Sequence, residues 1–398
     1  MAAFDLTTAT NLFKIKYGKL SENTYNSATV LLGRVKKEYN FTGKRMDVAV
    51  PTSFAGGVGS ALLPTANSAN YQDAQITSKK VYSVIEIERE AIKAAENDEG
   101  AFVRMTKEAV RKGVESFNRN MSRILFNDAS GSLGQFSGNA TGTATNPILT
   151  ITAASWKEAN FEEKDYINVN TLASVWEVTA VVPATRVVNL TRISGSDDLT
   201  AIGVGTHTVY MQNSKDADPE GLKGVLDATS GTKYSVTIAR RWQAFQKAAG
   251  GAGLTVDLMN ECMLGVDKQC GKMPNLIMTG YVQFRKLINL LEDQKQYIIE
   301  PRVAELKGKV SFKGVEFMST AGPVGVFIDR FIEDDRMYFL NDNYITIYHR
   351  PDSPGWADDD GTVFLRKAST DNYEARYASY CQVYIPPSFH GVMTGLAT

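Results

Sequence analysis

The chain has little cysteine and little histidine, with three residues of each among 398. The cysteines are Cys262, Cys270 and Cys381, and the histidines are His207, His349 and His390. The cysteines are too few and too unevenly spaced for a disulfide framework or a zinc site, and no histidine has a metal-ligand spacing. A serine or cysteine triad would need one of these histidines, and no nucleophile elbow is present. We therefore expect the thiols to pack as small core side chains.

Long apolar runs and a marked net charge are also missing. No run approaches the roughly 18–20 residues that span a bilayer, and the start "MAAFDLTTATNLFKIKYGK" has no apolar stretch of a secretory signal. A formal net charge of −1 does not indicate a dedicated nucleic-acid or membrane-surface protein. We expect a soluble intracellular protein without membrane contact, folded into two or three domains.

What the chain does have is long extensions. Residues 1–45 are polar with scattered aromatic residues, which predicts an extended arm with one short helix around residues 24–38. Two β-like runs, Val48–Pro51 and Val81–Ile87, flank a long Gly/Ala/Ser/Asn-rich excursion. A hairpin of that length, with small residues at its tip, cannot pack on itself. It must lie in solvent or on a neighbouring molecule.

The following segment predicts one long amphipathic helix, from Asp98 to about Asn127. Its apolar face comprises Phe102, Ala109, Val110, Gly113, Phe117, Met121 and Ile124. Its opposite face is basic and comprises Arg104, Lys107, Arg111, Lys112 and Arg119. A solvated helix face is the interpretation we favour for these bases. A face turned toward a polyanion, either DNA or an acidic scaffold, is the alternative.

The composition changes after this helix. The stretch "GSLGQFSGNATGTATNP" is typical of a linker, and short alternating runs over residues 148–212 predict a small all-β unit, sandwich or barrel, inserted into a larger domain. Beyond residue 225 the pattern is α/β. It predicts a helix at about 255–271, the strand "NLIMTG", a helix at about 281–293, and strands to the end.

Motifs for phosphate and calcium are incomplete. "GVDKQCGKM" has five residues between its glycines and Met273 where a P-loop has Ser or Thr, and "GVGSAL" lacks the third glycine of a dinucleotide loop. The stretch "DADPEGLKGVLD" places four acids at positions 1, 3, 5 and 12 of a calcium loop: Asp216, Asp218, Glu220 and Asp227. Pro219 and the aspartate at the last position weaken that match. We favour a plain acidic turn and expect no metal and no cofactor.

An acidic cluster, Glu333, Asp334 and Asp335, lies between two apolar, aromatic-rich runs. Catalytic carboxylates usually project from separate elements into one pocket. Adjacent acids in a hairpin turn more often face solvent and keep strand edges from pairing wrongly. We therefore favour a solvent-facing turn and expect no enzyme. A metal-dependent hydrolase that uses these three acids is the alternative from a different functional class.

The order of these segments resembles the major capsid protein of tailed bacteriophages, which has the Hong Kong 97 fold. The resemblance rests on layout and on four stretches: "YSVIEIEREAIKAAENDEGAFVRMTKEAVRKGVESFNRNMSRILF", "GLKGVLD", "LTVDLMNECMLGVDKQCGKMPNLIMTGYVQFRKLINLLED" and "FIEDDRMYFLNDNYITIYH". It covers almost the whole chain except the β insertion, which departs from the minimal family plan.

The resemblance implies an α+β capsid fold with an inserted small all-β domain. Its implied parts are an N-terminal arm (1–45), an extended loop or E-loop (46–90), a peripheral domain with its spine helix (91–133), the insertion (134–215), the rest of the peripheral domain (216–273), an axial domain (274–350), and a return to the peripheral domain (351–398). The E-loop residues implied to contact neighbouring subunits are Phe54, Val58, Leu62, Leu63 and Tyr71. Residues 333–335 become an axial-domain turn whose acids serve solubility or subunit contacts.

The implied function is structural. Copies of the chain would assemble as hexamers and pentamers into an icosahedral head that encloses double-stranded DNA, contacted without sequence specificity. The implied partners are other copies, a portal, a decoration protein and a separate scaffolding protein, since we expect no N-terminal scaffolding segment to be cut away. The implied location is the virion, assembled in the host bacterial cytoplasm. An encapsulin-type nanocompartment shell shares the fold and remains an alternative. A β-rich tail or adhesion protein would explain the insertion but not the long helix.

Overall fold

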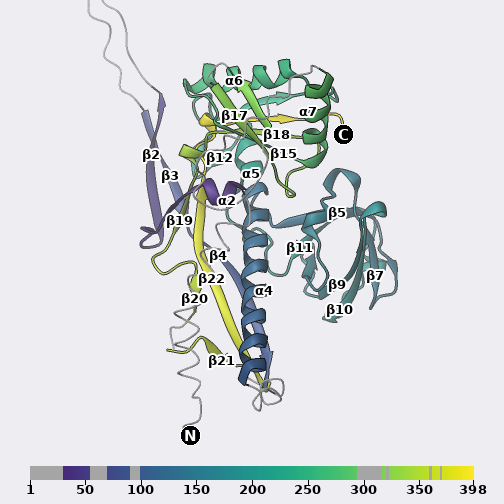
Figure 1. The fold of residues 1–398 in the computed structure, drawn as a ribbon. Coiled ribbons are helices and arrows are strands. Elements are labelled where there is room, and N and C mark those ends of the chain that lie inside the picture. Colours follow the sequence, from purple (N-terminus) through teal and green to yellow (C-terminus); the bar gives the residue numbers. More distant parts are fainter. Residues whose placement is uncertain are drawn as a thin grey trace, which may run out of the picture.

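The computed structural model describes residues 30–53, 70–89, 99–293, 315–319, 322–357, 361–367 and 370–398. For residues 99–109 and 291–293 it describes the backbone alone. Figure 1 shows three bodies: a long helix packed along a long sheet, a mixed α/β layer at one end of that helix, and a β-rich domain beside it. Most of the expected N-terminal arm, residues 1–29, lies outside the described residues.

Helix α4, Glu99–Phe126, is the long amphipathic helix that the sequence predicts. Four described residues of its predicted apolar face are buried, namely Val110, Phe117, Met121 and Ile124, while Gly113 is half-buried. The ring of Phe117 lies edge-on to the ring of Tyr377, with centroids 4.9 Å apart. The apolar face is thus confirmed over this part of the helix, whereas the side chains of Phe102 and Ala109 lie outside the description.

The helix packs on a long sheet. Strand β4, Lys79–Glu88, pairs along its whole length with β22, Asn372–Tyr384, in antiparallel register. The other strands of this sheet are β1 Lys36–Glu38, β19 Thr346–His349, β20 Gly355–Trp356 and β21 Phe364–Arg366. Gly113 of α4 touches the side chain of Ile85 so closely that a Cβ at this glycine would collide with it. A residue without a side chain therefore lets the helix lie flat on β4.

Two sequence predictions are corrected here. The run Val81–Ile87 was expected to return the hairpin, but β3, Asn70–Thr77, is the strand that pairs with β2, Arg45–Ser53. The run at 81–87 pairs with β22 instead, because its alternating apolar side chains are buried under α4. The predicted helix at 24–38 is, in its described part, only α2, Val30–Arg34, because residues 36–38 form β1.

A second sheet has six strands in the order β14-β23-β18-β15-β17-β16. These are β14 Phe245–Ala248, β23 Gly391–Thr394, β18 Met337–Leu340, β15 Leu276–Thr279, β17 Gly322–Ile328 and β16 Val315–Ser319. Helices α6, Val256–Cys270, and α7, Tyr281–Asp293, lie against it and are the two helices that the periodicity predicts. Thr255 caps α6 by accepting the N–H of Leu258, and Gly271 ends it in a left-handed conformation.

The acidic segment is not a hairpin turn. Its flanking strands β17 and β18 do not pair with each other, because each pairs with β15, which lies between them. The segment is therefore a connection that passes over the end of β15. The domain boundaries expected from the sequence do not coincide with this sheet. Strands β14 and β23 belong to it, although the stretches that contain them, 216–273 and 351–398, were assigned to the peripheral domain.

Residues 132–211 form the inserted all-β domain. Its strands run in the order β5-β11-β8-β9-β10-β7-β6, and an isolated bridge between Phe136 and Ile151 joins β5 to the end of β7, which closes the sheet into a barrel. The strands are β5 Ser132–Ser137, β6 Thr141–Gly142, β7 Pro147–Thr150, β8 Tyr166–Val169, β9 Val175–Val182, β10 Val187–Ser194 and β11 Thr206–Met211. Its core is its own and is centred on the fully buried Trp176.

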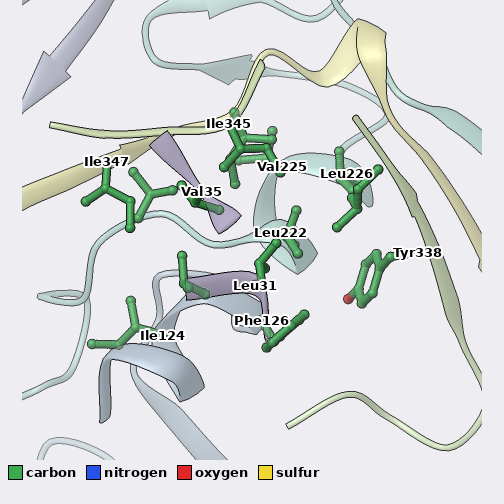
Figure 2. Packing of buried hydrophobic residues seen from close by; sticks show 14 of the residues in the cluster. Leu31, Val35, Ile124, Phe126, Leu222, Val225, Leu226, Tyr338, Ile345 and Ile347 are labelled. Atoms are coloured by element: carbon green, nitrogen blue, oxygen red, sulfur yellow. The ribbon is translucent and has the colours of Figure 1, made fainter. Parts of the chain in front are cut away.

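The main core lies where the long helix and its sheet meet the α/β layer (Figure 2). Leu31 from α2, Phe126 from the end of α4 and Tyr338 from β18 pack around the short helix α5, Leu222–Leu226. A Cβ at Gly221, just before α5, would collide with the carbonyl oxygens of Ile124 and Asn127. The stretch "GLKGVLD" therefore carries a glycine because α5 lies directly against the backbone at the end of the spine helix.

Candidate functional site

The hairpin of β2 and β3 extends away from the body of the molecule (Figure 1). Four of the E-loop residues expected to contact neighbours lie outside the described residues: Phe54, Val58, Leu62 and Leu63. The fifth, Tyr71, lies on β3 with 62% of its surface exposed. The described part of the hairpin thus presents a large aromatic side chain to solvent, and its contact with another subunit stays a prediction.

The base of the hairpin is held by a small turn that the sequence gave no reason to single out. Strands β12, Thr232–Lys233, and β13, Val236–Thr237, are joined by Tyr234 and Ser235, which both have positive φ. The N–H of Gln75 on β3 donates to the carbonyl oxygen of Tyr234 over 2.7 Å. The Tyr234 hydroxyl donates to the carbonyl oxygen of Val383 over 2.8 Å. This turn therefore connects the hairpin to the long sheet.

A groove of about 280 Å³ lies between β2 and the body. It is lined by Ala49, Val50, Pro51, Trp242, Asn343, Tyr344, Thr346, Tyr348, Tyr384, Pro386 and Phe389. The lining contains no carboxylate, imidazole, thiol or amine, which are the usual acid, base and nucleophile groups of an active site. The polar lining residues are Asn343, Thr346 and three tyrosines, so the groove offers hydroxyl and amide groups beside its apolar contact area.

The basic face of the spine helix is largely occupied within the chain. Arg119 was expected on a solvated or polyanion-facing surface, but only 11% of its side chain is exposed. It pairs with Glu162 and Asp165, which both belong to the inserted barrel. Its Nη2 atom lies 2.5 Å from Oδ2 of Asp165. The placement expected for Arg119 is wrong because the barrel docks on this side of the helix.

The other predicted bases differ from Arg119. Arg111 is exposed and pairs with Glu115 at 2.9 Å, one helical turn along. Lys112 is exposed. The side chains of Arg104 and Lys107 lie outside the described residues, so their role as an inner-face contact stays a prediction.

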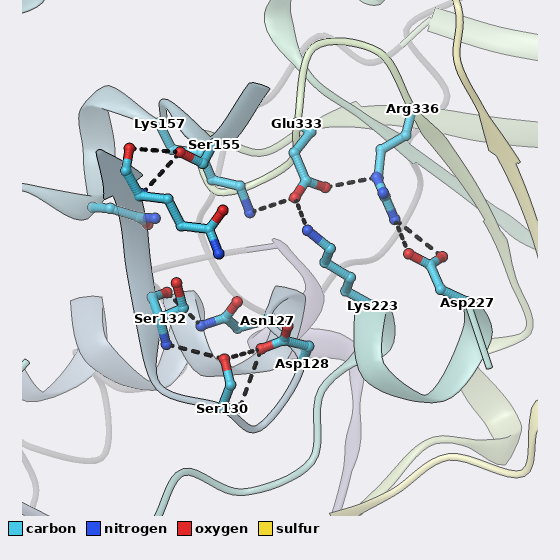
Figure 3. A network of polar contacts seen from close by, with 12 residues as sticks. Asn127, Asp128, Ser130, Ser132, Ser155, Lys157, Lys223, Asp227, Glu333 and Arg336 are labelled. Carbon is cyan, nitrogen blue, oxygen red and sulfur yellow. Dashed lines mark hydrogen bonds and ion pairs between the residues drawn. The ribbon is translucent and has the colours of Figure 1, made fainter. Parts of the chain in front are cut away.

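The acids at 333–335 do not share one environment (Figure 3). Glu333 was expected to face solvent, but only 13% of its side chain is exposed. Its carboxylate lies 3.1 Å from Nζ of Lys157, 2.7 Å from Nζ of Lys223 and 2.6 Å from Nε of Arg336. Arg336 also pairs with Asp227 at 2.9 Å. The expectation for Glu333 is therefore wrong, while Asp334 is exposed as expected.

These ion pairs join three parts of the fold. Lys157 comes from the barrel, Lys223 from α5, and Glu333 with Arg336 from the connection over β15 (Figure 3). Burial alone would raise the pKa of Glu333, but the charges of Lys157, Arg336 and Lys223 outweigh it and hold the pKa at about 2. Glu333 therefore stays ionised at neutral pH and acts as a structural anion at the junction.

The calcium-loop acids point to separate partners. Asp218 pairs with Arg123 at 3.2 Å, Glu220 with Lys233 at 3.1 Å, and Asp227 with Arg336. Helix α5 occupies most of the second half of the stretch, where a calcium loop would have to wrap around its ion. Across the described residues, no three His, Cys, Asp or Glu side chains come together in a group that could hold a metal ion. The near-match is an acidic segment used for ion pairs.

Sequence reasoning missed Lys157, Lys223, Arg336 and Arg123 as partners of these acids. No local signal could have found them, since Lys223 and Glu333, for example, are 110 positions apart. The only hint was the arginine that directly follows the acidic cluster.

No protein-family model and no curated protein matches this chain. No helix in the described part of the chain is long and apolar enough to cross a membrane. Solved structures do match. A chain of the cyanophage A-1(L) capsid asymmetric unit superimposes with a TM-score of 0.55 and 10% identity, over 92% of this chain and 93% of that one.

Two further matches have lower scores. The holo-SrpI encapsulin complex from Synechococcus elongatus PCC 7942 gives a TM-score of 0.47 at 8% identity, over 93% and 89% of the two chains. The capsid of a native GTA particle gives 0.46 at 12% identity, over 94% and 91%. The cyanophage match spans almost all of both chains. The chain has the α+β Hong Kong 97-like capsid fold, with a small all-β domain inserted.

Proposed function

We propose that this chain is the major capsid protein of a tailed bacteriophage. Copies of it assemble as hexamers and pentamers into an icosahedral head that encloses double-stranded DNA. The observation that carries the proposal is the match to the cyanophage capsid chain over 92% of this chain. The hairpin of β2 and β3 supports it, because its described base is fixed to the body while Tyr71, near its far end, is exposed.

The proposal includes partners and a location that the fold match alone does not reach. A separate scaffolding protein, a portal and a decoration protein would act on the shell, which is built in the host bacterial cytoplasm and becomes part of the virion. The proposed regions of the subunit are the arm, the E-loop and the peripheral and axial domains, with the sheet of β15 and β18 as the centre of the axial part.

An enzyme function has less support. Glu333, the acid on which the hydrolase hypothesis depends most, is surrounded by three cations at ion-pair distance. Three cations around this carboxylate disfavour a metal ion beside it, and a pKa of about 2 makes it a weak base.

Shortening the tip of the E-loop tests the proposed function. Residues 54–69 are replaced by Asn-Gly, a dipeptide that forms a tight hairpin turn between Ser53 and Asn70. The shortened subunit should keep its circular dichroism spectrum and its unfolding midpoint, yet form no particles in the electron microscope. Full-size particles from the shortened chain would contradict the proposed role of the hairpin. A matched control shortens the η3 turn of the barrel, Pro183–Thr185, and should leave assembly unchanged.

A further inference from the structure

The groove between β2 and the body borders an unpaired strand edge. Among the described strands, β2 pairs with β3 alone. Consecutive residues of a strand point to opposite faces of its sheet. One wall of the groove is nevertheless made of three consecutive residues of β2, Ala49, Val50 and Pro51, which indicates that this wall is the edge of the strand. An unpaired edge is a template for pairing with a further strand.

The other wall of the groove is aromatic. The rings of Tyr344 and Phe389 are stacked with centroids 3.9 Å apart, and the ring of Tyr384 lies 6.4 Å from that of Trp242 and 6.3 Å from that of Tyr348. None of the described residues that line the groove carries a charge. Its volume of about 280 Å³ lies just below the roughly 300–1,000 Å³ of pockets that bury a drug-sized ligand. The groove therefore suits a few apolar side chains of an extended segment.

One stretch of the arm has side chains of this kind. The sequence "FKIKY" alternates Phe13, Ile15 and Tyr17 with Lys14 and Lys16. As a strand, it would carry its three apolar side chains on one face and both lysines on the other. Phenylalanine, isoleucine and tyrosine are also favoured in strands. Because the groove has no acid to pair with a lysine, the apolar face is the one that fits.

The lysines would also have a suitable position. In the register of the hairpin, Ala49 lies opposite Asp73 of β3, and both are exposed, whereas Val50 on the other face is buried. Residues in register on neighbouring strands share a face. A strand added beside β2, with its apolar side chains on the face of Val50, would therefore carry its lysines on the face of Asp73. Opposite charges favour that orientation.

The arm is long enough to reach the groove of its own subunit. Strand β1 pairs with β19, and Lys36 lies opposite Thr346, a residue of the groove lining. Val30, where the described chain begins, is thus at most about 27 Å from Thr346. The chain from Tyr17 to Val30 can span up to about 43 Å. A flexible tether of this kind raises the effective concentration to the mM range, which favours docking within one subunit.

We propose that the stretch "FKIKY" of the arm docks as an added strand along β2 of its own subunit, with Phe13, Ile15 and Tyr17 in the groove. Main-chain hydrogen bonds to the edge of β2 supply affinity, and the aromatic wall selects the apolar side chains. Docking covers an edge that could otherwise pair with other chains. It does not depend on the proposed function, since it involves a single subunit.

Disulfide trapping tests where the arm docks. In purified full-length chain, kept below the concentration at which particles form, Ile15→Cys is combined with Ala49→Cys, and mild oxidation should link the two positions within one chain. Peptide mass spectrometry distinguishes this link from any that involves a native cysteine. The control combines Ile15→Cys with Thr77→Cys, which is exposed on the same hairpin but outside the groove lining. The control should give at least about tenfold less linked product.

Hydrogen exchange tests what holds the arm in place. The backbone amides around residue 15 should exchange about tenfold more slowly than in a free peptide of the same sequence, which corresponds to a segment docked about 90% of the time. Ile15→Lys brings a charge into an uncharged groove and should abolish this protection. Lys16→Ser changes the opposite face and is the matched control, which should keep it.

Each test has results that would overturn the proposal. A link between two chains, seen as a dimer whose yield rises with concentration, would show that a second copy fills the groove. Equal linking of position 15 to positions 49 and 77 would show that the arm only passes near the hairpin. An arm that exchanges as fast as the free peptide, or that exchanges equally in the Ile15→Lys and Lys16→Ser variants, would also exclude docking through the apolar side chains.

Discussion

Lys157 of the inserted barrel and Glu333 of the connection over β15 form an ion pair of 3.1 Å, although they lie in opposite halves of the chain. Both side chains are largely buried. Together with Arg119 and its two acids, this pair forms a charged attachment between the barrel and the body. The core of the barrel is a separate cluster, so the barrel is a unit with its own packing and a polar attachment.

Replacing Glu333 by glutamine should destabilise the subunit by about 3–5 kcal/mol at pH 7, because Lys157 and Lys223 would be left without their anion in a buried site. The free energy of unfolding of unassembled subunits in urea measures this loss. The neighbouring exposed acid gives a matched control, since Asp334→Asn should change stability by no more than about 0.5 kcal/mol. Equal effects of the two substitutions would show that the junction carries no special stability.

The effect of Glu333→Gln on the free energy of unfolding should become smaller as the pH falls. The pKa of Glu333 is lowered from its usual 4.5 to about 2 in the folded chain. The stabilisation is therefore fully present above about pH 4.5 and is lost as the pH falls toward 2. The stability difference between the unmodified chain and Glu333→Gln should shrink over that interval. A difference that stays constant from pH 7 to pH 3 would contradict the ionised junction.

Asp329 should behave in the opposite sense. Burial raises its pKa from 3.8 to about 6, even though its carboxylate accepts the N–H of Phe331 over 2.9 Å. Its contribution to stability is present below about pH 3.8 and is lost as the pH rises through 6. Asp329→Asn keeps an oxygen for Phe331, so it should stabilise the subunit by roughly 2–3 kcal/mol at pH 7.5 and have little effect at pH 4. Urea unfolding at the two pH values measures the stability of the variant against that of the unmodified chain. An Asp329→Asn variant that is less stable than the unmodified chain at both pH values would exclude this explanation.

Gly221 should tolerate no side chain. A Cβ there would collide with backbone oxygens at the end of the spine helix, which cannot move aside like a flexible side chain. Gly221→Ala should therefore cost about 1–3 kcal/mol or more in unfolding free energy. Gly253, which has open space around its Cα, is the control, and Gly253→Ala should be neutral or slightly stabilising. A harmless Gly221→Ala would mean that α5 is not tightly docked.

Arg119 should hold the barrel while Lys112 should not. Arg119→Gln removes the cation that Asp165 and Glu162 share, so hydrogen exchange of the segment around residues 158–165 should become faster and stability should fall by about 1–3 kcal/mol. Lys112→Gln changes an exposed residue of the same helix and should leave both quantities nearly unchanged. Indistinguishable exchange in the two variants would count against docking by charge.

Local patterns in the sequence predicted the three longest described helices well. The helices α4, α6 and α7 follow from apolar spacing. Thr255 and Gly271, which cap the two ends of α6, are local signals because they directly flank that helix in the sequence. The inserted all-β domain followed from alternation in the same way. These features depend on neighbours in the sequence, which a single chain displays.

Pairings between distant segments could not be predicted. The run at 81–87 alternates as any strand does, but nothing in it specifies β22 as its partner. Arg119 was assigned to a free basic face because its acidic partners lie in a different domain. Glu333 was placed in solvent because a cluster of adjacent acids usually is, while its three cations come from other segments or from beyond the cluster.

The central claim is that this chain builds a shell, and electron microscopy of the purified full-length protein tests it most directly. The account predicts closed particles with icosahedral symmetry, or hexameric and pentameric capsomers that close on raising the concentration or adding a scaffolding protein. Light scattering on the same sample should show a mass far above the 43.7 kDa of one chain. A monodisperse monomer at high concentration, with no particles or capsomers in the micrographs under either condition, would contradict it.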